Sequence, residues 1–444
     1  MTSRRTSTLP DMDAGTNASA TWTRGFTAFR HYNYRLYFGG QLVSLIGTWM
    51  QNIGQGWLVL QLTHSPFYLG VVTALQSLPV LFFALLGGVV ADRFPKNRLL
   101  VVTQSTMALL ALVLALDVSA GTVRVWHIYI LATLLGLVQS VDAPTRQAFG
   151  VEMVGKDDLL NAIALNSALY NSARIFGPAI AGVLIAVAGM AACFYLNSLS
   201  FLAVIAALLV MRPAQFHLGQ RAARGGSVRG QLGEGLGFVR RTPIVLMVMA
   251  LICIFSIFAF NFNVILPVFA DSVLHIGVSG YGALSSAMGV GSLIAAVSLA
   301  FARRTRWPVM LAGIGSFVIF GLAFSWSRNV PLSLVLLAGM GASTMIFTTQ
   351  ANTTVQTLAP DALRGRVMSL YMMLFMGSQP VGAFLTGSLA SIFSAPIALT
   401  AGAAVCAMAL VGAVFHGPGR STATPAELAA SAPSAAAEAV AAGD

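Results

Sequence analysis

The sequence predicts an all-α membrane protein whose twelve transmembrane helices form two pseudo-symmetric six-helix bundles. Three observations lead to this prediction: long apolar runs, basic residues on alternate connections between them, and a polar interruption halfway along. Hydrophobic residues make up 57% of the 444 residues and charged residues only 9%. The mean hydropathy of +0.80 is typical of a chain that lies mostly in lipid.

The apolar runs have the length of membrane-spanning helices. About 20 residues cross the hydrocarbon core at a rise of about 1.5 Å per residue. Strands are not expected, because a membrane barrel shows segments of about 10 residues with alternating polarity. Twelve runs qualify: residues 36–62, 67–91, 99–119, 125–142, 161–187, 190–211, 244–270, 280–302, 308–327, 330–356, 365–391 and 395–416.

The positions of the basic residues predict the topology. All Lys and Arg residues except Arg124, Arg174 and Arg328 lie at the two ends or on every second connection. Short loops that carry Lys and Arg stay in the cytoplasm, so both termini are expected there. The net charge of +11 then reflects topology and contact with anionic membrane lipids, and nucleic acid is not an expected partner. Residues 1–30 show no cleavable signal, so the first helix is expected to direct insertion.

A polar stretch divides the chain into two halves. It is rich in Arg, contains the single acidic residue Glu234, and is predicted to hold an amphipathic helix on the membrane surface. Pro178 and Pro380 lie in similar glycine-containing segments of the two halves, which supports a parallel repeat with a substrate site between the halves. The predicted organisation is a cytoplasmic N-terminal tail (1–30), an N-terminal six-helix bundle (31–211), a cytoplasmic linker (212–243), a C-terminal six-helix bundle (244–416) and a disordered cytoplasmic tail (417–444).

The connection between the second and third runs carries the most specific local pattern. Gly88 is predicted to allow close approach of two helices at the membrane edge. Asp92, Arg93 and Lys96 follow it. Polar contacts at the rim of a bundle can form in one state and break in another, so these residues are predicted to act as a conformational latch. The alternative is that the basic residues only determine topology.

This loop resembles the signature of the major facilitator superfamily, which has the form G-x-x-x-D-R-x-G-R-[RK]. Pro95 and Asn97 depart from that form, since they replace its second glycine and one of its basic residues. The matching residues are Gly88, Asp92, Arg93 and Lys96. Gly177, Pro178 and Gly182 are similar to the helix-5 motif of the superfamily's exporters.

Other segments resemble the branch that contains bacterial enterobactin exporters and macrolide efflux proteins. They are Asn33-Tyr34-Arg35-Leu36, Gly47-Thr48-Trp49-Met50-Gln51, Gly56-Trp57 and Asp142-Ala143-Pro144-Thr145-Arg146-Gln147. The resemblance covers residues 29–416. It implies a twelve-helix secondary transporter in the bacterial inner membrane that exports its substrate with energy from the proton gradient.

One face of the first run is polar. The residues on this face are Gln41, Ser44, Thr48, Gln51, Asn52 and Gln55. Amides that face lipid are unfavourable, so the face is expected to contact protein or a wet cavity. Substrate binding by Gln51, Asn52 and Gln55 is the favoured interpretation. The alternative is hydrogen bonding between helices, at a modest ~0.6 kcal/mol per contact.

Arg174 is the one basic residue expected deep within a run. It lies roughly 14 Å into the fifth run at 1.5 Å per residue, and an ionisable residue at such depth is a candidate functional group. It is predicted either to contact an anionic substrate or to anchor helix packing. No carboxylate is expected at similar depth, because Asp142 and Asp271 are placed near helix ends. Asp142 is expected to pair with a cation such as Arg146 there, and both are assigned to the latch.

The second half combines soft apolar side chains with a few polar ones. Phe and Met residues of the seventh and eleventh runs accompany Asn261, Asn263, Thr348 and Gln379. Adaptable apolar contacts with a few amides suit a bulky amphipathic molecule, so these four residues are predicted to bind substrate. Ordinary helix packing explains most of the Phe and Met residues equally well.

The predicted function is export of an amphipathic small organic molecule, such as a drug or siderophore, by alternating access. The expected partners are this substrate, protons as coupling ion and membrane lipids, with the protein as a monomer. No nucleophile–base pair, phosphate-binding loop or metal-ligand cluster is apparent, so an enzyme, a cofactor and a metal site are not expected. A non-transporting receptor or regulatory protein on the same fold, or a lipid flippase, is the alternative.

Overall fold

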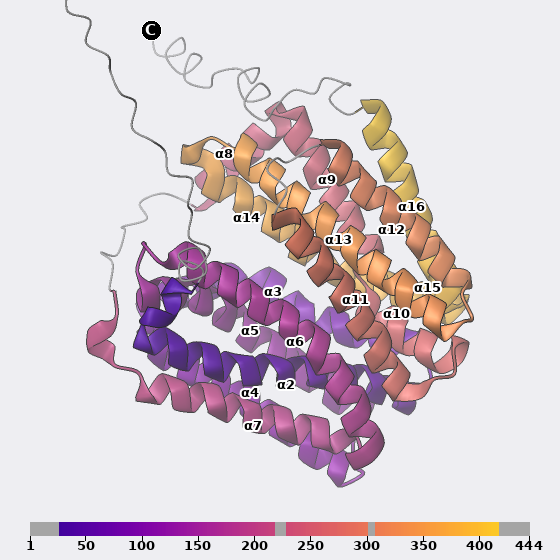
Figure 1. Ribbon diagram of the computed structural model, residues 1–444, viewed down its shortest axis with the longest axis horizontal. Helices are drawn as coiled ribbons and strands as arrows, with labels where there is room; N and C mark the ends of the chain where they lie inside the picture. The colour runs from indigo at the N-terminus through magenta and orange to yellow at the C-terminus, as the bar shows by residue number, and fades with distance from the viewer. Residues whose placement is uncertain (1–25, 218–227, 301–306, 417–444) are drawn as a thin grey trace, which may run out of the picture.

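The computed structural model describes residues 26–217, 228–300 and 307–416. The predicted disordered tail over 417–444 and most of the predicted N-terminal tail lie outside these residues. All regular elements in the described part are helical (Figure 1). They are η1 (Thr27–Arg30), α2 (Tyr32–Thr63), α3 (Pro66–Arg93), α4 (Lys96–Ser119), α5 (Val125–Val154), α6 (Leu159–Ala188), α7 (Met190–Val210), η2 (Pro213–Gln215), α8 (Val228–Arg241), α9 (Pro243–Phe258), α10 (Phe262–Val268), the π-helical turn η3 (Phe269–Val273), α11 (Gly277–Ala300), α12 (Trp307–Trp326), α13 (Val330–Leu358), α14 (Asp361–Gly377), α15 (Gln379–Ile392) and α16 (Ala395–His416).

Eleven helical segments of the described chain are long and apolar enough to cross a membrane. They match the second to twelfth predicted runs. The first predicted run forms α2, a 32-residue helix whose polar face lowers its hydropathy. The seventh run breaks near Asn261 between α9 and α10, and the eleventh breaks at Ser378 between α14 and α15. The second break precedes Pro380, which has no backbone N–H to donate to a carbonyl oxygen of the preceding turn.

The fourth predicted run, residues 125–142, is too short. Helix α5 continues through Pro144 to Val154. A proline within a membrane helix bends it without ending it where neighbouring helices pack against it. Phe149 is fully buried, so packing holds the segment beyond the proline. The expected position of Asp142 at a helix end is therefore wrong, because this residue lies inside α5.

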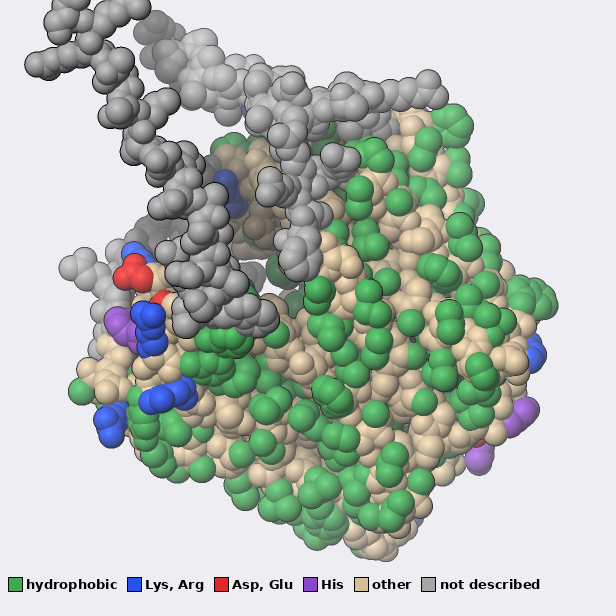
Figure 2. All heavy atoms as spheres, viewed as in Figure 1, with side chains coloured by type: hydrophobic (Ala, Val, Ile, Leu, Met, Phe, Trp, Pro, Cys, Tyr) green, Lys and Arg blue, Asp and Glu red, His purple; other side chains and the backbone are tan. Residues whose placement is uncertain are grey.

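The helices form two groups that follow the order of the chain. Helices α2 to α7 lie together, and α9 to α16 lie together beside them (Figure 1). In the first group α3 packs on α5, and α7 packs on α2 and α4. In the second, α13 packs on α11 and α12, and α16 packs on α12. Figure 2 shows hydrophobic side chains spread over the broad face of both groups and charged side chains gathered at its edges, as expected of a surface that contacts lipid.

Glycines let the helices of one group approach closely. The hydrogen of Gly136 in α5 faces α3, and a Cβ atom there would lie only 2.1 Å from the carbonyl oxygen of Gln76. Gly87 of α3 faces α5 in the same way. A Cβ atom on Gly87 would lie 2.0 Å from the carbonyl oxygen of Ser140. The close approach predicted at Gly88 is wrong, because nothing lies within 4 Å of a Cβ atom built there.

Replacing Gly136 by Val is expected to destabilise the first group. Backbone atoms cannot move aside as a flexible side chain can, so the cost is expected to be at least the ~1–3 kcal/mol of an overpacked core. A lower midpoint of thermal unfolding in detergent measures it. Gly150→Val on the same helix is the matched control, since nothing lies within 4 Å of a Cβ atom there. Equal midpoints for the two variants would contradict this packing.

Contacts between the two groups concentrate at one end of the helices. This end carries the α2–α3 turn and is called the α2–α3 end below; the opposite end, with the α3–α4 turn, is called the α3–α4 end. A Cβ atom on Gly70 of α3 would lie 2.5 Å from the carbonyl oxygen of Ala383 in α15. A Cβ atom on Gly282 of α11 would lie 2.4 Å from the carbonyl oxygen of Pro178 in α6. The backbones of both pairs are therefore in direct contact.

Polar and aromatic side chains join the groups in the same region. The hydroxyls of Ser65 and Ser391 are 3.3 Å apart, and Ser279 donates to the carbonyl oxygen of Gly182 at 3.0 Å. The ring of Trp57 stacks on that of Tyr281 with centroids 6.4 Å apart. These contacts lie between the helix midpoints and the α2–α3 end.

The predicted amphipathic helix of the linker is present as α8. It packs against α14 and α9, and Gly235 lies against Arg366 and Leu370 of α14. Arg366 also pairs with Glu234. Helix α8 therefore belongs to the second group, to which it is held by an ion pair and by close packing.

Candidate site for substrate and ion coupling

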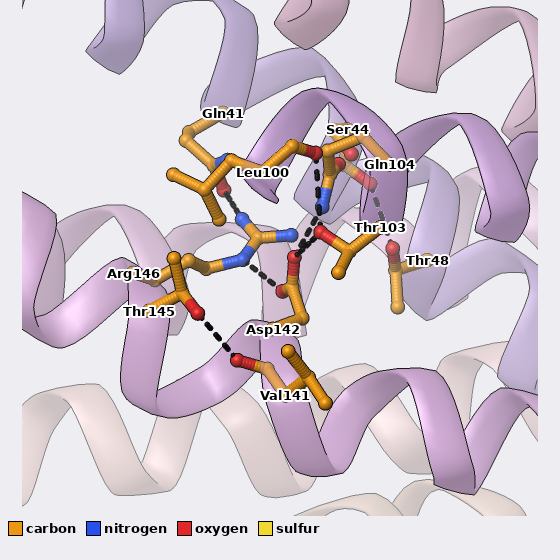
Figure 3. Close-up of polar contacts among 10 residues, drawn as sticks. All are labelled: Gln41, Ser44, Thr48, Leu100, Thr103, Gln104, Val141, Asp142, Thr145 and Arg146. Carbon is orange, nitrogen blue, oxygen red and sulfur yellow. Dashed lines mark hydrogen bonds and ion pairs between the residues drawn. The ribbon is translucent and has the colours of Figure 1, made fainter. Parts of the chain in front are cut away.

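A carboxylate lies buried between α2, α4 and α5. Asp142 of α5 is only 4% exposed. Its Oδ1 accepts hydrogen bonds from Thr103 Oγ1 at 2.6 Å and from Gln104 Nε2 at 2.9 Å, both on α4 (Figure 3). Its Oδ2 pairs with Nε of Arg146, one turn later on α5. Two neutral donors and one cation therefore compensate the buried charge.

Arg146 extends this network to α2. Its Nη1 donates to Oε1 of Gln41, so one guanidinium joins α5 to α2 while the carboxylate joins α5 to α4. Two buried atoms of the network have no hydrogen-bond partner, namely Gln41 Nε2 and Gln104 Oε1. A free donor and a free acceptor beside a buried ion pair can accommodate a rearrangement of its hydrogen bonds.

The sequence predicted only part of this site. The pairing of Asp142 with Arg146 is confirmed. Thr103 and Gln104 were missed, because neither was recognised as a partner of a carboxylate on another helix. The available signal was two adjacent polar residues at the start of an otherwise apolar run.

The loop between α3 and α4 is held to α5. Lys96 starts α4, and its Nζ lies 2.6 Å from Oε1 of Glu152 near the end of α5. Asp92 and Arg93 end α3 and are exposed. The Lys96–Glu152 contact lies within the first group of helices, and sequence reasoning missed Glu152. A latch role for Gly88, Asp92, Arg93 and Lys96 stays a prediction.

The N-terminal segment is also attached at the α3–α4 end. His31 Nε2 lies 2.8 Å from Oδ2 of Asp158, the residue that precedes α6. Hydrogen bonds from Thr27 and then His31 lower the pKa of Asp158. A depressed carboxyl pKa contributes stability at neutral pH that is lost as the carboxyl becomes protonated in acid.

The polar face of α2 contacts its own group. Gln51 accepts a hydrogen bond from Asn197 of α7 at 2.6 Å, and Gln51 and Gln55 are 7% and 8% exposed. Gly47 on the same face lies against Asn197 and Ser200. For Gln41 and Gln51 the structure supports the alternative, hydrogen bonding between helices. Asn52 is partly exposed.

Arg174 lies midway along α6, where the two groups meet. It is partly buried, and no carboxylate of the described residues forms an ion pair with it. Gly289 of α11 faces the backbone of Arg174 and Ile175, and Ser286 of α11 donates to the carbonyl oxygen of Ile175 at 2.7 Å. The backbone of Arg174 therefore lies at the junction of the two groups, and its guanidinium has no ion-paired carboxylate among the described residues.

The residues that resemble a helix-5 motif are packing positions. A Cβ atom on Gly177 would lie 2.4 Å from Cβ of Trp49 in α2. Gly182 faces Ser279 of α11, and the carbonyl oxygen of Pro178 faces Gly282. This segment of α6 thus touches its own group on one face and the second group on another.

The polar residues predicted in the second half are dispersed over three helices. Asn261, at the α9–α10 break, is 8% exposed and donates to the carbonyl oxygen of Ile257 at 2.6 Å. Thr348 donates to its own helix, at 2.8 Å from the carbonyl oxygen of Thr344. Gln379 starts α15 and is partly buried, whereas Asn263 is exposed. Asn261 lies against α15, next to Gly382.

One of the Phe residues expected near substrate belongs to the packed core. The ring of Phe255 lies 4.7 Å from that of Phe317 and 4.6 Å from that of Phe347, between centroids. For this side chain the alternative of ordinary helix packing holds. Within the described residues no group of three metal-ligating side chains occurs.

Comparison with known families identifies the chain. The family model of transmembrane secretion effectors, a branch of the major facilitator superfamily, matches residues 23–440. The chain belongs to this family. The resemblance seen in the α3–α4 loop is thereby confirmed, and the protein is a multi-pass membrane transporter rather than an enzyme.

Two relatives transport siderophores according to their names. The staphyloferrin A transporter of Staphylococcus aureus is 25% identical over 362 residues, which cover 81% of this chain and 90% of the relative. An enterobactin exporter of Escherichia coli is 25% identical over 378 residues, which cover 83% of this chain and 87% of the relative.

Solved transporter structures share the fold. A bacterial homolog of the lysosomal transporter Spinster, in an inward-facing and unoccupied conformation, superposes with a TM-score of 0.67 at 10% identity, over 86% of this chain and 94% of that one. The nucleoside transporter NupG also gives a TM-score of 0.67, at 13% identity, over 86% of this chain and 98% of that one. At these identities the likeness concerns the fold alone.

Proposed function

We propose that this protein exports an amphipathic, siderophore-like organic molecule across the bacterial inner membrane, driven by protons. The observation that carries the proposal is the cation at the junction of the two groups: Arg174 lies there without an ion-paired carboxylate of the described residues. An anionic, oxygen-rich substrate supplies the missing counterion. The names of the two siderophore-transporting relatives agree with this substrate class.

The proposed architecture has twelve spanning helices in two six-helix bundles with both termini in the cytoplasm. Helix α2 is the twelfth span, since its 32 residues reach well beyond the ~20 that cross a bilayer. Its Gln41 and Gln51 side chains bond to α5 and α7, so these two amides do not face lipid. With this topology the α2–α3 end is external. The contacts between the groups lie toward that end, which supports an inward-open state of an alternating-access cycle.

The proposed substrate site lies between the bundles around Arg174. Asn52, Asn263, Thr348 and Gln379 are at least partly exposed, as residues that contact a solute in this conformation must be. Gln51, Gln55 and Asn261 are buried and would reach a substrate only after a rearrangement. A monomer is sufficient, because both bundles belong to one chain.

We assign proton coupling to Asp142. Its carboxylate is the buried acid of the network that joins α2, α4 and α5. Protonation removes its charge and weakens the pairing with Arg146, which retains Gln41 as a partner. A change of protonation can thus change how three helices of one bundle are held together.

Arg174 variants test the substrate site. Arg174→Gln is expected to lower transport of anionic chelators at least about tenfold, because one charged hydrogen-bonded contact is lost. Transport of a neutral amphipathic dye should change little, and Arg174→Lys should retain part of the anion transport. Uptake into inverted membrane vesicles, normalised to protein level, measures both. Arg124→Gln, in the exposed α4–α5 turn, is the control. An equal loss for anionic and neutral compounds would contradict direct contact.

A further inference from the structure

A pocket lies at the α2–α3 end, away from Arg174 and Asp142. Its volume is about 460 Å³, within the range of pockets that hold small organic ligands. Both groups of helices contribute to it. The residues that matter here are Leu60, His64 and Pro66 of the first group and Asp271, Arg328 and Ser394 of the second.

Two opposite charges line this pocket without pairing with each other. Arg328 holds its Nη1 against its own turn, at 3.0 Å from the carbonyl oxygen of Ser327 and 3.4 Å from that of Ser325. A guanidinium has five N–H donors, so this arrangement leaves others for a ligand. Within the described residues no donor or cation is bonded to the carboxylate of Asp271.

Two backbone segments that line the pocket have unusual conformations. Asp271 lies in the π-helical turn η3, where Leu274 N donates to the carbonyl oxygen of Phe269 at 2.9 Å. Such turns are uncommon and frequently occur at functional sites. His64 ends α2 in the left-handed region at a φ of 48°. This conformation is uncommon for a residue other than glycine.

The remaining wall combines apolar side chains with the polar residues His64, Ser272 and Ser394. Leu60 and Val268 are buried side chains, and Ala390, Ala395 and Pro396 also face the pocket. One accessible cation and one accessible anion beside these apolar side chains complement a small molecule that carries a carboxylate, an ammonium group and a short hydrocarbon side chain.

We infer that this pocket binds a small zwitterion of the amino-acid type, with its carboxylate on Arg328 and its ammonium group on Asp271. Because both groups of helices form the pocket, a ligand there favours the state in which the α2–α3 end is closed. A ligand that binds one state better shifts the population toward it. If the proposed export cycle and topology hold, the zwitterion acts from outside and slows export.

The test uses the purified full-length protein and three probes of nearly equal shape. L-Leucine carries both charges, 4-methylpentanoate lacks the ammonium group, and 3-methylbutylamine lacks the carboxylate. Isothermal titration should show leucine binding at least about tenfold tighter than either analogue, since each analogue lacks one charged contact. Binding needs no transport, so its outcome is independent of whether export of a siderophore is found.

Two variants locate the contacts. Asp271→Asn should remove the preference for leucine over 4-methylpentanoate, which lacks the ammonium group. Arg328→Gln should remove the preference for leucine over 3-methylbutylamine, which lacks the carboxylate. Arg124→Gln, a change of exposed charge outside the pocket, should bind all three as the wild type does. Unchanged thermal unfolding without ligand verifies the fold. Absence of leucine binding to the wild type, equal binding of the analogues, or unchanged preferences in both variants would overturn the inference.

Discussion

Replacing Asp142 by Asn is expected to lower the free energy of unfolding by about 3 kcal/mol, because the partly buried guanidinium of Arg146 is left without its counterion. The amide oxygen still accepts from Thr103 and Gln104, so the rest of the network can persist. Proton-driven transport should fall to the background of vesicles without the protein. Thermal unfolding in detergent and vesicle transport at matched protein levels measure the two effects.

The double variant Asp142→Asn with Arg146→Gln separates stability from coupling. Removing both charges leaves no unpaired ion, so most of the lost stability is expected to return. Transport should remain lost, since the proposed proton carrier is still absent. Asp117→Asn is the control for the loss of a carboxylate. Asp117 pairs with His127 near the α2–α3 end of the first group. A double variant that transports at the wild-type rate with proton dependence would contradict the role of Asp142.

Substitution of Gly282 by Val is expected to abolish transport, because it prevents closure of the α2–α3 end. The added Cβ atom would lie 2.4 Å from the carbonyl oxygen of Pro178 and 3.2 Å from Cα of Gly182. Neither backbone can yield without separating α11 from α6, so the groups should part at this end. Spin labels at Ser65 and Ser391, whose hydroxyls lie 3.3 Å apart, should then show a longer distance distribution.

Gly412→Val is the matched control, since nothing lies within 4 Å of a Cβ atom on this glycine of α16. It should transport normally and keep the short label distance. A Gly282→Val protein that also keeps the short distance and transports at the wild-type rate would show that this contact does not control access.

The sequence was sufficient for the class of fold but not for the partners of its polar residues. Apolar run length predicted the spans, because a bilayer imposes one length on every helix that crosses it. The predicted run 125–142 ends earlier than helix α5, which continues to Val154. A charged residue followed by Pro144 resembles a helix end when the neighbouring helices are unknown. Thr103, Gln104 and Glu152 were missed for the same reason, because their partners lie on other helices.

Helix faces were harder to predict than helices. Four residues of the polar stripe of α2, Gln41, Ser44, Gln51 and Gln55, are buried, yet nothing in the stripe tells whether Gln51 meets a cavity or Asn197 of α7. A single residue changes the face by about 100°, which is why Gly87, and not Gly88, makes the close contact with α5. Contacts across the molecule therefore depend on the rotation of each helix, which the pattern of residue types does not determine.

The most direct test of the account is energised export of a siderophore-like compound. An efflux-deficient bacterium expressing this chain is loaded with a fluorescent catechol chelator and with a neutral drug-like dye, with and without a proton uncoupler. The account predicts lower accumulation of the chelator, an effect that the uncoupler abolishes and that Arg174→Gln reduces. Unchanged chelator accumulation, with the protein confirmed in the membrane, would contradict it.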